Sequence, residues 1–351
     1  MFRVKRAISI ALCLTITAAM FAACGSSTQP SAVSSGAASS ASAADTPASS
    51  SDTLVIYNSN PEDWTAPIIK EFQEETGIKI ELVGGNTGEL HARVRAETEN
   101  PLGDILWGGT PDAYMALSEY LEAYESTEKG SIRPEILDPN NAYYCITMDP
   151  YAIAYNTNLV TEDEAPRTWA DLLDPKWKGK IALSDPTKSA STYVNMCIIM
   201  KQLNSDFSVI EQLIDNLDGK LANGSAAQIK SLADGEFAIA LTYEESILRY
   251  INNGANMQIV YPEDGTQLSS GCFAIVKGAK NMENAKKFID FALSKKVQEQ
   301  MAQYQRRSVR VDVESTGMTP LDNLNATAFD LDWSAAYKEE FMAQWQAYVT
   351  R

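Results

Sequence analysis

Small polar residues and glycines recur where a predicted strand ends and a predicted helix begins. Four loops have this design, at residues 57–61, 84–88, 107–111 and 184–192. Their candidate ligand-binding residues are Ser59, Asn60, Thr87, Gly88, Gly109, Thr110, Ser184, Asp185, Thr187, Ser189, Ser191 and Thr192. A helix start presents unpaired N–H groups and a partial positive charge, which suit a phosphate or a carboxylate. The loops predict a small-ligand site, although similar caps and glycines also occur in α/β proteins that bind no ligand there.

Three of these loops contain a residue typical of an N-cap directly before proline. They read Asn60-Pro61, Thr110-Pro111 and Asp185-Pro186. Asn, Thr and Asp cap helices through their side-chain oxygens, and proline suits the first helical position because its missing N–H would be unpaired there. We therefore expect a helix to begin at each of these points.

Strand and helix patterns alternate along most of the chain. Strands are predicted at 54–57, 78–83, 104–107, 180–183, 237–241, 257–261 and 272–277, and a long extended run at 143–155. Helices are predicted at 61–76, 87–98, 111–124, 169–173, 190–203, 207–217, 225–233, 244–252, 282–293, 296–304 and 334–349. This alternation predicts an α/β fold with a mostly parallel sheet, in which ligands bind at the carboxyl ends of the strands. About 300 folded residues exceed the usual size of one core, so two lobes are expected.

The first 51 residues are typical of a secreted lipoprotein. A basic start and a short apolar stretch predict a signal peptide at residues 1–23. Cys24 follows small residues, as in a lipobox, and becomes the lipid-bearing N-terminus if cleavage falls before it; the alternative is plain signal cleavage. Residues 24–51 are mostly Ser, Ala, Gly, Thr and Pro, which predicts a flexible tether.

The charge balance limits the classes of partner. The formal net charge is −17, and removal of Arg3, Lys5 and Arg6 with the signal peptide takes it to −20. Such an acidic surface argues against binding to nucleic acid and against electrostatic docking on anionic lipid. We expect membrane attachment only through a lipid at Cys24.

Few residues could support catalysis or hold a metal. His91 is the only histidine, and no G-x-S-x-G, H-E-x-x-H, C-x-x-C or Walker motif occurs. We therefore expect neither an enzyme nor a cofactor; the remote alternative is a secreted enzyme. Cys145, Cys197 and Cys272 remain beyond the leader. Three buried, unpaired thiols are one possibility, and one disulfide plus a free thiol is the other.

Four passages together resemble the extracellular solute-binding proteins of ABC transporters, in the ferric, phosphonate and sugar-phosphate branch. They read LVIYNSNPEDWTAPIIKEFQEETGIKIELV, GDILWGG, TWADLLDPKWKGKIALSDP and AIVKGAKNMENAKKFIDFALSKKVQEQM. The resemblance implies a two-lobe, type II binding-protein fold. It places lobe 1 at 52–148 plus 262–305 and lobe 2 at 149–261 plus 306–351, joined by hinge strands near 145–155 and 257–272. It also implies a monomer that delivers a solute to a membrane permease.

The loops differ from those of ferric members, which place a His, a Glu and adjacent tyrosines at the site. Here the matching positions read Asn58-Ser59-Asn60-Pro61, Gly109 and 241–246, with Tyr243 as the one tyrosine. The chain looks more similar to members that bind small organic anions, either phosphorylated sugars or phosphonates. Ferric-iron, thiamine and polyamine ligands are the alternatives.

The remaining candidate ligand-binding residues are Tyr243, Glu244, Glu245 and Arg307. Asp185, Glu244 and Glu245 would accept hydrogen bonds from sugar hydroxyls or an amine. A negatively charged ligand also requires local positive charge, and residues 306–310, RRSVR, are the densest basic run of the mature chain. Arg306 and Arg310 should point one way and Arg307 the other in an extended segment. We predict that an arginine of this run, with Arg307 the candidate, faces the ligand.

Overall fold

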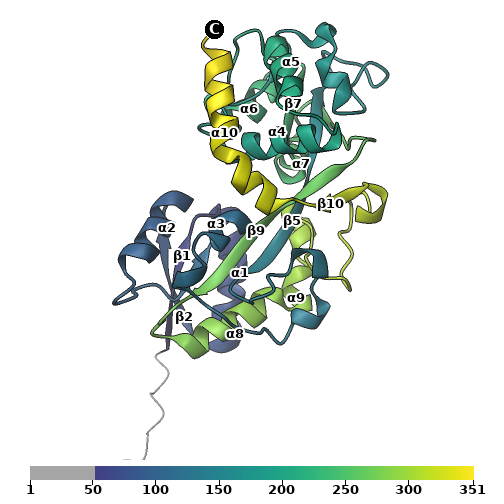
Figure 1. The fold of residues 1–351 in the computed structure, drawn as a ribbon. Helices are drawn as coiled ribbons and strands as arrows, with labels where there is room; N and C mark the ends of the chain where they lie inside the picture. The colour runs from purple at the N-terminus through teal and green to yellow at the C-terminus, as the bar shows by residue number, and fades with distance from the viewer. Residues whose placement is uncertain (1–51) are drawn as a thin grey trace, which may run out of the picture. The chain divides into compact units, whose positions relative to one another are not determined.

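The computed structural model describes residues 52–351, so the predicted signal peptide, Cys24 and the tether lie outside the described residues. Two groups of helices and strands are joined by two long strands (Figure 1). The first group contains β1 (Thr53–Asn58), α1 (Glu62–Thr76), β2 (Lys79–Gly84), α2 (Thr87–Ala96), β3 (Ile105–Trp107), α3 (Pro111–Met115), β4 (Leu121–Glu122), α8 (Met282–Leu293) and α9 (Lys295–Gln298). The second contains β6 (Ile181–Ala182), α4 (Ala190–Gln202), α5 (Ser208–Leu217), α6 (Ser225–Ala233), β7 (Ile239–Tyr243), α7 (Glu244–Asn252), β8 (Met257–Val260) and α10 (Leu331–Val349).

The two connecting strands are β5 (Tyr144–Asn156) and β9 (Thr266–Val276), and the short β10 (Ala326–Ala328) pairs with β9. The first half of β5 pairs with β9, whereas residues 151–156 pair with β7 and β8. One strand therefore belongs to the sheets of both lobes. The strand order is β2-β1-β3-β9-β5-β7-β6. The predicted α/β class is confirmed, and the sheet is mixed because β5 and β9 run antiparallel to several neighbours.

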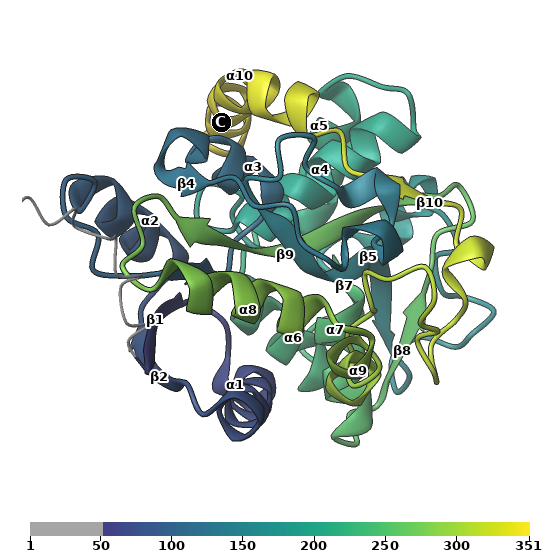
Figure 2. The ribbon, with the colours of Figure 1, turned by 90° about the horizontal axis from the view of Figure 1, so that it is seen from below.

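The hydrophobic cores separate at β5. One cluster contains residues of β1, β3, α1 and α8 together with Val309, and a second contains residues of α4, α5 and β7 together with Trp345 of α10. A smaller cluster lies around Ile229 and Ile247. In the first lobe α8 packs against β9 (Figure 2). The predicted lobe boundaries stay a prediction, but Val309 packs with the first lobe although the segment from 306 onward was assigned to the second.

Local sequence signals explain most element ends. Gly77 has φ 72° and ends α1, since glycine adopts this left-handed conformation without strain. Asn86 begins α2 with a reciprocal capping box to Glu89. Helix α3 ends at Met115, far short of the predicted 124, because Leu121 and its neighbour pair with β9 instead. The short segments at 170–173 and 301–304 form 3₁₀ turns.

Two predicted caps are wrong. The N-cap position of α1 is Pro61, and the Asn60 amide instead donates to the carbonyl of Trp107 at 3.2 Å. Asp185 does not cap α4, because its carboxylate accepts from the backbone and hydroxyl of Thr187, and Ser189 is the cap. Among the described residues no helix is long and apolar enough to cross a membrane.

Candidate ligand-binding cleft

A cleft of about 380 Å³ lies where the loops of the two lobes approach each other. The loops after β1 and β3 and the start of α2 form one wall, the starts of α4 and α7 form the other, and β5 and β9 contribute between them. The predicted residues that line it are Ser59, Asn60, Thr87, Gly109, Thr110, Ser191, Tyr243 and Glu245. The structure thus brings all four predicted loop regions or their helices to one cavity, and contact of these residues with a ligand stays a prediction.

The other predicted residues do not line this cleft. They are Gly88, Ser184, Asp185, Thr187, Ser189, Thr192, Glu244 and Arg307. Ser184 is fully buried, and its hydroxyl and backbone N–H both donate to Gln228 at 2.6 and 2.8 Å. The Ser189 hydroxyl accepts from the N–H of Thr192. Most small polar groups of residues 184–192 therefore build the turn and the helix cap, and Ser191 is the predicted residue of this stretch that reaches the cavity.

Close backbone approach shapes the wall from the first lobe. Gly108 and Gly109 have φ values of 124° and 102°. A Cβ on Gly108 would lie 2.1 Å from the hydroxyl oxygen of Ser59, so no side chain fits there. The Thr87 hydroxyl donates to that of Ser59 at 3.0 Å, and the Ser59 N–H donates to the carbonyl of Trp107. The hydroxyls at the starts of α1 and α2 are thereby held together at the cleft.

Within the basic run 306–310, the arginine that lines the cleft is Arg306. Arg307 is instead buried and donates two hydrogen bonds to Glu244, of 2.6 and 2.7 Å. Tyr261 also donates to Glu244. Arg306 and Arg307 therefore point in different directions, as predicted for neighbours in an extended segment. Arg306 reaches the cavity, whereas Arg307 was the candidate. Neither Glu244 nor Arg307 lines the cleft, and their side chains hydrogen-bond to each other instead.

Arg306 belongs to a cluster of charges at the cleft. Its guanidinium lies 4.7 Å from the ring centroid of Trp64, 3.6 Å from Asp149 and 3.7 Å from Glu245. These separations exceed normal hydrogen-bond lengths. Among the described residues, the Nε of Arg306 and the Oδ1 of Asp149 are buried without a hydrogen-bond partner. One donor and one acceptor of the residues that line the cleft therefore lack a hydrogen-bond partner within the described residues.

Burial raises the pKa of Asp149 from 3.8 to about 7. The nearby guanidinium of Arg306 opposes this shift, whereas the carboxylates of Glu245 and Glu244 add to it. Asp149 is only 4% exposed, so a charged carboxylate there loses most of its hydration. A solute that donates a hydrogen bond to Asp149 would favour its ionised form.

Sequence reasoning missed several residues of the cleft. They include Asp63, Asp112, Thr147, Asp149, Tyr151, Tyr193, Arg249, Ser269, Ser270, Phe329 and Lys338. Those on β5 had a readable signal, because residues 147, 149 and 151 alternate along one strand and therefore share a face. The presence of Asp149 in a mostly apolar extended run is the sequence signal that could have identified the face of β5 that lines the cleft.

The cleft is arranged to hold a solute by hydrogen bonds and charge. His91 lies outside it, buried against Tyr114 at a ring distance of 5.6 Å, and burial lowers its pKa. Among residues 52–351 no group of three or more His, Cys, Asp and Glu side chains is placed to hold a metal ion. Two α/β lobes joined by paired strands around a polar cleft define a solute-binding protein.

The chain belongs to a family with this role. Residues 114–339 match the family described as bacterial extracellular solute-binding protein. A putative 2-aminoethylphosphonate-binding periplasmic protein of Salmonella typhi is 29% identical over 68% of this chain and 72% of its own. A spermidine/putrescine-binding periplasmic protein of Haemophilus influenzae is 26% identical over 72% of this chain and 74% of its own.

A solved structure extends the similarity to most of both chains. The periplasmic binding protein AfuA from Actinobacillus pleuropneumoniae, with fructose-6-phosphate bound, superposes with a TM-score of 0.74 and 26% identity, covering 86% of this chain and 99% of AfuA. The predicted family and two-lobe type II fold are confirmed. The protein is the substrate-binding component of an ABC importer, a family whose members act outside the cytoplasm and are transport proteins, not enzymes.

Proposed function

We propose that this protein captures a small organic anion, a phosphorylated sugar or a phosphonate, and delivers it to a membrane permease. The anionic group would lie between the start of α4 and Arg306. The observation that carries this proposal is the composition of that helix start: Ala190 and Ser191 line the cleft, and the first turn of α4 contains no acidic residue. Its partial positive charge is therefore not offset within its own first turn.

The opposite part of the solute would contact the carboxylates. Asp149 has a buried oxygen without a partner, and Glu245 lines the same cavity. Carboxylates accept hydrogen bonds from sugar hydroxyls or from an amino group. The relative named for 2-aminoethylphosphonate and the AfuA structure with fructose-6-phosphate support this combination, because each named compound joins a phosphorus-containing anion to such donors.

A cationic solute is the second candidate. Four carboxylates line the cleft, from Asp63, Asp112, Asp149 and Glu245, against the three positive charges of Arg249, Arg306 and Lys338. Arg249 already pairs with Glu245 at 3.0 Å. This balance favours a polyamine or thiamine over a dianion at long range. A ferric ion is a weaker candidate, for which Tyr151 and Tyr243, with ring centroids 6.2 Å apart, would be the oxygen ligands to test.

Thermal unfolding of the mature protein with a panel of solutes separates these candidates. The panel contains sugar phosphates, free sugars, aminoethylphosphonate, spermidine, thiamine and ferric citrate. A ligand at 100 times its Kd stabilises the folded state by about 2.7 kcal/mol. We expect a shift with phosphorylated compounds or phosphonates and none with the parent compounds. Stabilisation only by spermidine, thiamine or ferric citrate would replace the proposal with the corresponding alternative.

We further propose that a lipid on Cys24 holds the mature protein at the membrane. The basis is the sequence pattern around Cys24 alone, with a polar tether after it. Replacement of Cys24 by Ala should move the secreted protein from the detergent-extracted membrane fraction to the soluble fraction, with unchanged ligand affinity. A membrane-bound Cys24→Ala protein would show that another feature provides the attachment.

A further inference from the structure

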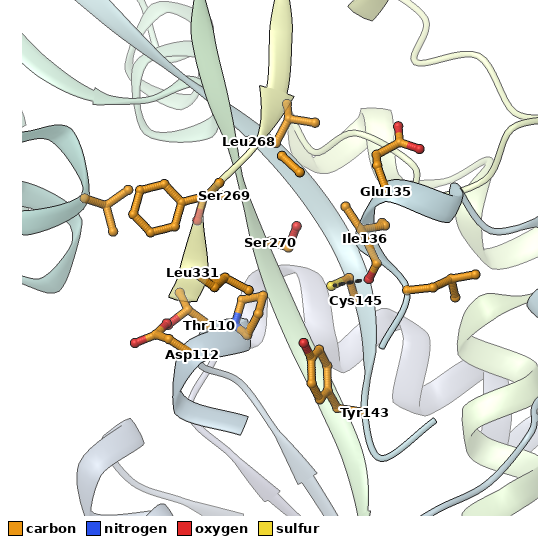
Figure 3. Close-up of a pocket in the computed structure, with 15 residues that line it drawn as sticks. Thr110, Asp112, Glu135, Ile136, Tyr143, Cys145, Leu268, Ser269, Ser270 and Leu331 are labelled. Atoms are coloured by element: carbon orange, nitrogen blue, oxygen red, sulfur yellow. Dashed lines mark hydrogen bonds between the residues drawn. The ribbon is translucent and has the colours of Figure 1, made fainter. Parts of the chain in front are cut away.

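Cys145 on β5 and Cys272 on β9 face each other within the first lobe. They are direct register partners in the antiparallel pair, and their sulfur atoms are 3.6 Å apart. Both are buried and in the thiol form. Figure 3 shows Cys145 beside β9 at a cavity, with its thiol directed to the carbonyl oxygen of Ile136. The sulfur lies 3.5 Å from that oxygen, and the cavity has a volume of about 100 Å³. No side chain separates the two sulfur atoms, because they are already in contact.

The hydrogen bonds of β9 show which type of strand pair the cysteines form. The N–H of Cys272 donates to the carbonyl of Gly109 at 3.0 Å, and the Cys272 carbonyl accepts from the N–H of Gly108 at 2.8 Å. Both backbone groups of Cys272 therefore point away from β5. In a regular non-hydrogen-bonded pair the Cα atoms lie about 4.5 Å apart, which falls within the range that disulfides span. The register of β5 against β9 shifts just after Cys145, between Cys145 and Thr147, but the two sulfur atoms remain 3.6 Å apart.

We propose that Cys145 and Cys272 are a disulfide-forming pair that joins the two connecting strands when the chain folds outside the cytoplasm. This proposal does not depend on which solute the cleft binds. The compartment favours it, because disulfides form and persist in oxidising extracytoplasmic surroundings. Cys197 cannot take part, since it is buried in the core of the second lobe on α4.

The oxidant is a small disulfide such as oxidised glutathione. One cysteine thiolate attacks it, forming a mixed disulfide and releasing one small thiolate. The second cysteine thiolate then attacks the protein sulfur of the mixed disulfide and releases the second small thiolate. The two protons lost by the cysteines protonate these leaving groups, so two protein thiols are oxidised by two electrons and one disulfide is reduced to two thiols.

Because both thiols are buried in the folded protein, we expect the disulfide to form before folding is complete. Cys145 and Cys272 are 1% and 0% exposed, and burial raises the pKa of the Cys272 thiol well above its ordinary value. The thiolate is the attacking species, so the folded, reduced protein should react slowly. Once formed, the bond would be equally protected from reductants. It would also fix the part of β9 whose backbone holds Gly108 and Gly109 at the cleft.

Peptide mass mapping of the secreted protein tests the proposal directly. The protein is unfolded in denaturant, its free thiols are alkylated either before or after reduction, and it is then digested. The expected result is a linked peptide pair containing Cys145 and Cys272 and an alkylated Cys197 without reduction. The same mapping is applied to reduced, unfolded protein after refolding with reduced and oxidised glutathione. Complete alkylation of all three cysteines in both preparations, or a bond to Cys197, would overturn the proposal.

Single substitutions provide the matched controls. Cys197→Ser should retain the linked peptides, and a reductant should lower its midpoint of thermal unfolding by several degrees, as in the parent protein. Cys145→Ser should lack the linked peptides, and its midpoint should not respond to reductant. Should Cys145→Ser fail to fold, the mapping of the unaltered protein still decides between bonded and free thiols. A reductant response that survives in folded Cys145→Ser would contradict the assignment.

Discussion

The guanidinium of Arg307 donates two hydrogen bonds to the carboxylate of Glu244, of 2.6 and 2.7 Å, with both side chains buried. The pair connects the start of α7 in the second lobe to a segment whose neighbours pack on the first lobe. Removing one member of a buried ion pair leaves an uncompensated charge and costs about 3–5 kcal/mol. We therefore predict that Arg307→Ala lowers the free energy of unfolding by roughly this amount, measured by urea titration.

The double variant Arg307→Met with Glu244→Leu is the control for this prediction. It removes both charges and should recover much of the lost stability, because no unpaired ion remains. Ligand affinity of folded Arg307→Ala should change little. A variant with wild-type stability but reduced affinity would place Arg307 in the cleft after all.

Arg306 should show the opposite behaviour. Its Nε lacks a hydrogen-bond partner and it lines the cleft. A charge-assisted hydrogen bond contributes roughly 1.5–3 kcal/mol, so Arg306→Gln should weaken anion binding on the order of 10- to 100-fold. Isothermal titration of the two arginine variants with the same compound makes the comparison. Equal affinities for wild type and Arg306→Gln would remove the arginine from the proposed site.

The raised pKa of Asp149 predicts that the stability of the protein depends on pH. Its folded pKa of about 7 lies above the ordinary 3.8 because burial disfavours the charged form. Between these values the folded state binds a proton that the unfolded chain has lost, so this contribution to stability is present at low pH and disappears as the pH rises through 7. Between pH 3.8 and pH 7, the free energy of unfolding of the wild type should therefore fall, relative to that of Asp149→Asn, by at most about 4 kcal/mol.

Urea titrations at pH 4, 5.5 and 7.5 check this sign. Asp149→Asn should be relatively more stable than wild type at the highest pH, and it should lose affinity for the solute because an acceptor oxygen is gone. The charged groups that act on Asp149 are Arg306, Arg307, Glu244 and Glu245, and all remain in this variant. Parallel pH profiles of the two proteins would show that Asp149 is already ionised when folded.

Two serines of the same stretch should separate stability from binding. The Ser184 hydroxyl is buried against Gln228, so Ser184→Ala should cost about 1 kcal/mol of stability without affecting affinity. Ser191 lines the cleft, and Ser191→Ala should lower affinity roughly three- to tenfold with little effect on unfolding. Thermal unfolding and ligand titration of both variants provide the comparison. An affinity loss in Ser184→Ala alone would reverse their roles.

The sequence predicted the elements well where a local signal sets their ends. Gly77 ends α1, Asn86 begins α2, and α7 and α8 have the predicted bounds of 244–252 and 282–293. Helix α3 was overextended because its sequence does not show that Leu121 pairs with β9, a partner more than 150 residues away.

The site was predictable to the level of loops but not of side chains. A serine or threonine in residues 184–192 could bind the ligand, form the turn or cap the helix, and the residue type alone does not distinguish these roles. For Ser184 the role is set by Gln228, which accepts both of its hydrogen bonds. Likewise, alternation separates Arg306 from Arg307, but the side that faces the cavity depends on the buried Glu244 from another segment. Long-range contacts of this kind leave no periodic signal in the sequence.

Isothermal titration of the mature protein with a phosphorylated or phosphonate compound and with its parent lacking the phosphorus group tests the central claim most directly. We predict micromolar affinity, about −8 kcal/mol, for the anion and no measurable binding of the parent. Binding of the parent with equal affinity, or of a polyamine in preference to either, would show that the start of α4 and Arg306 do not hold an anionic group.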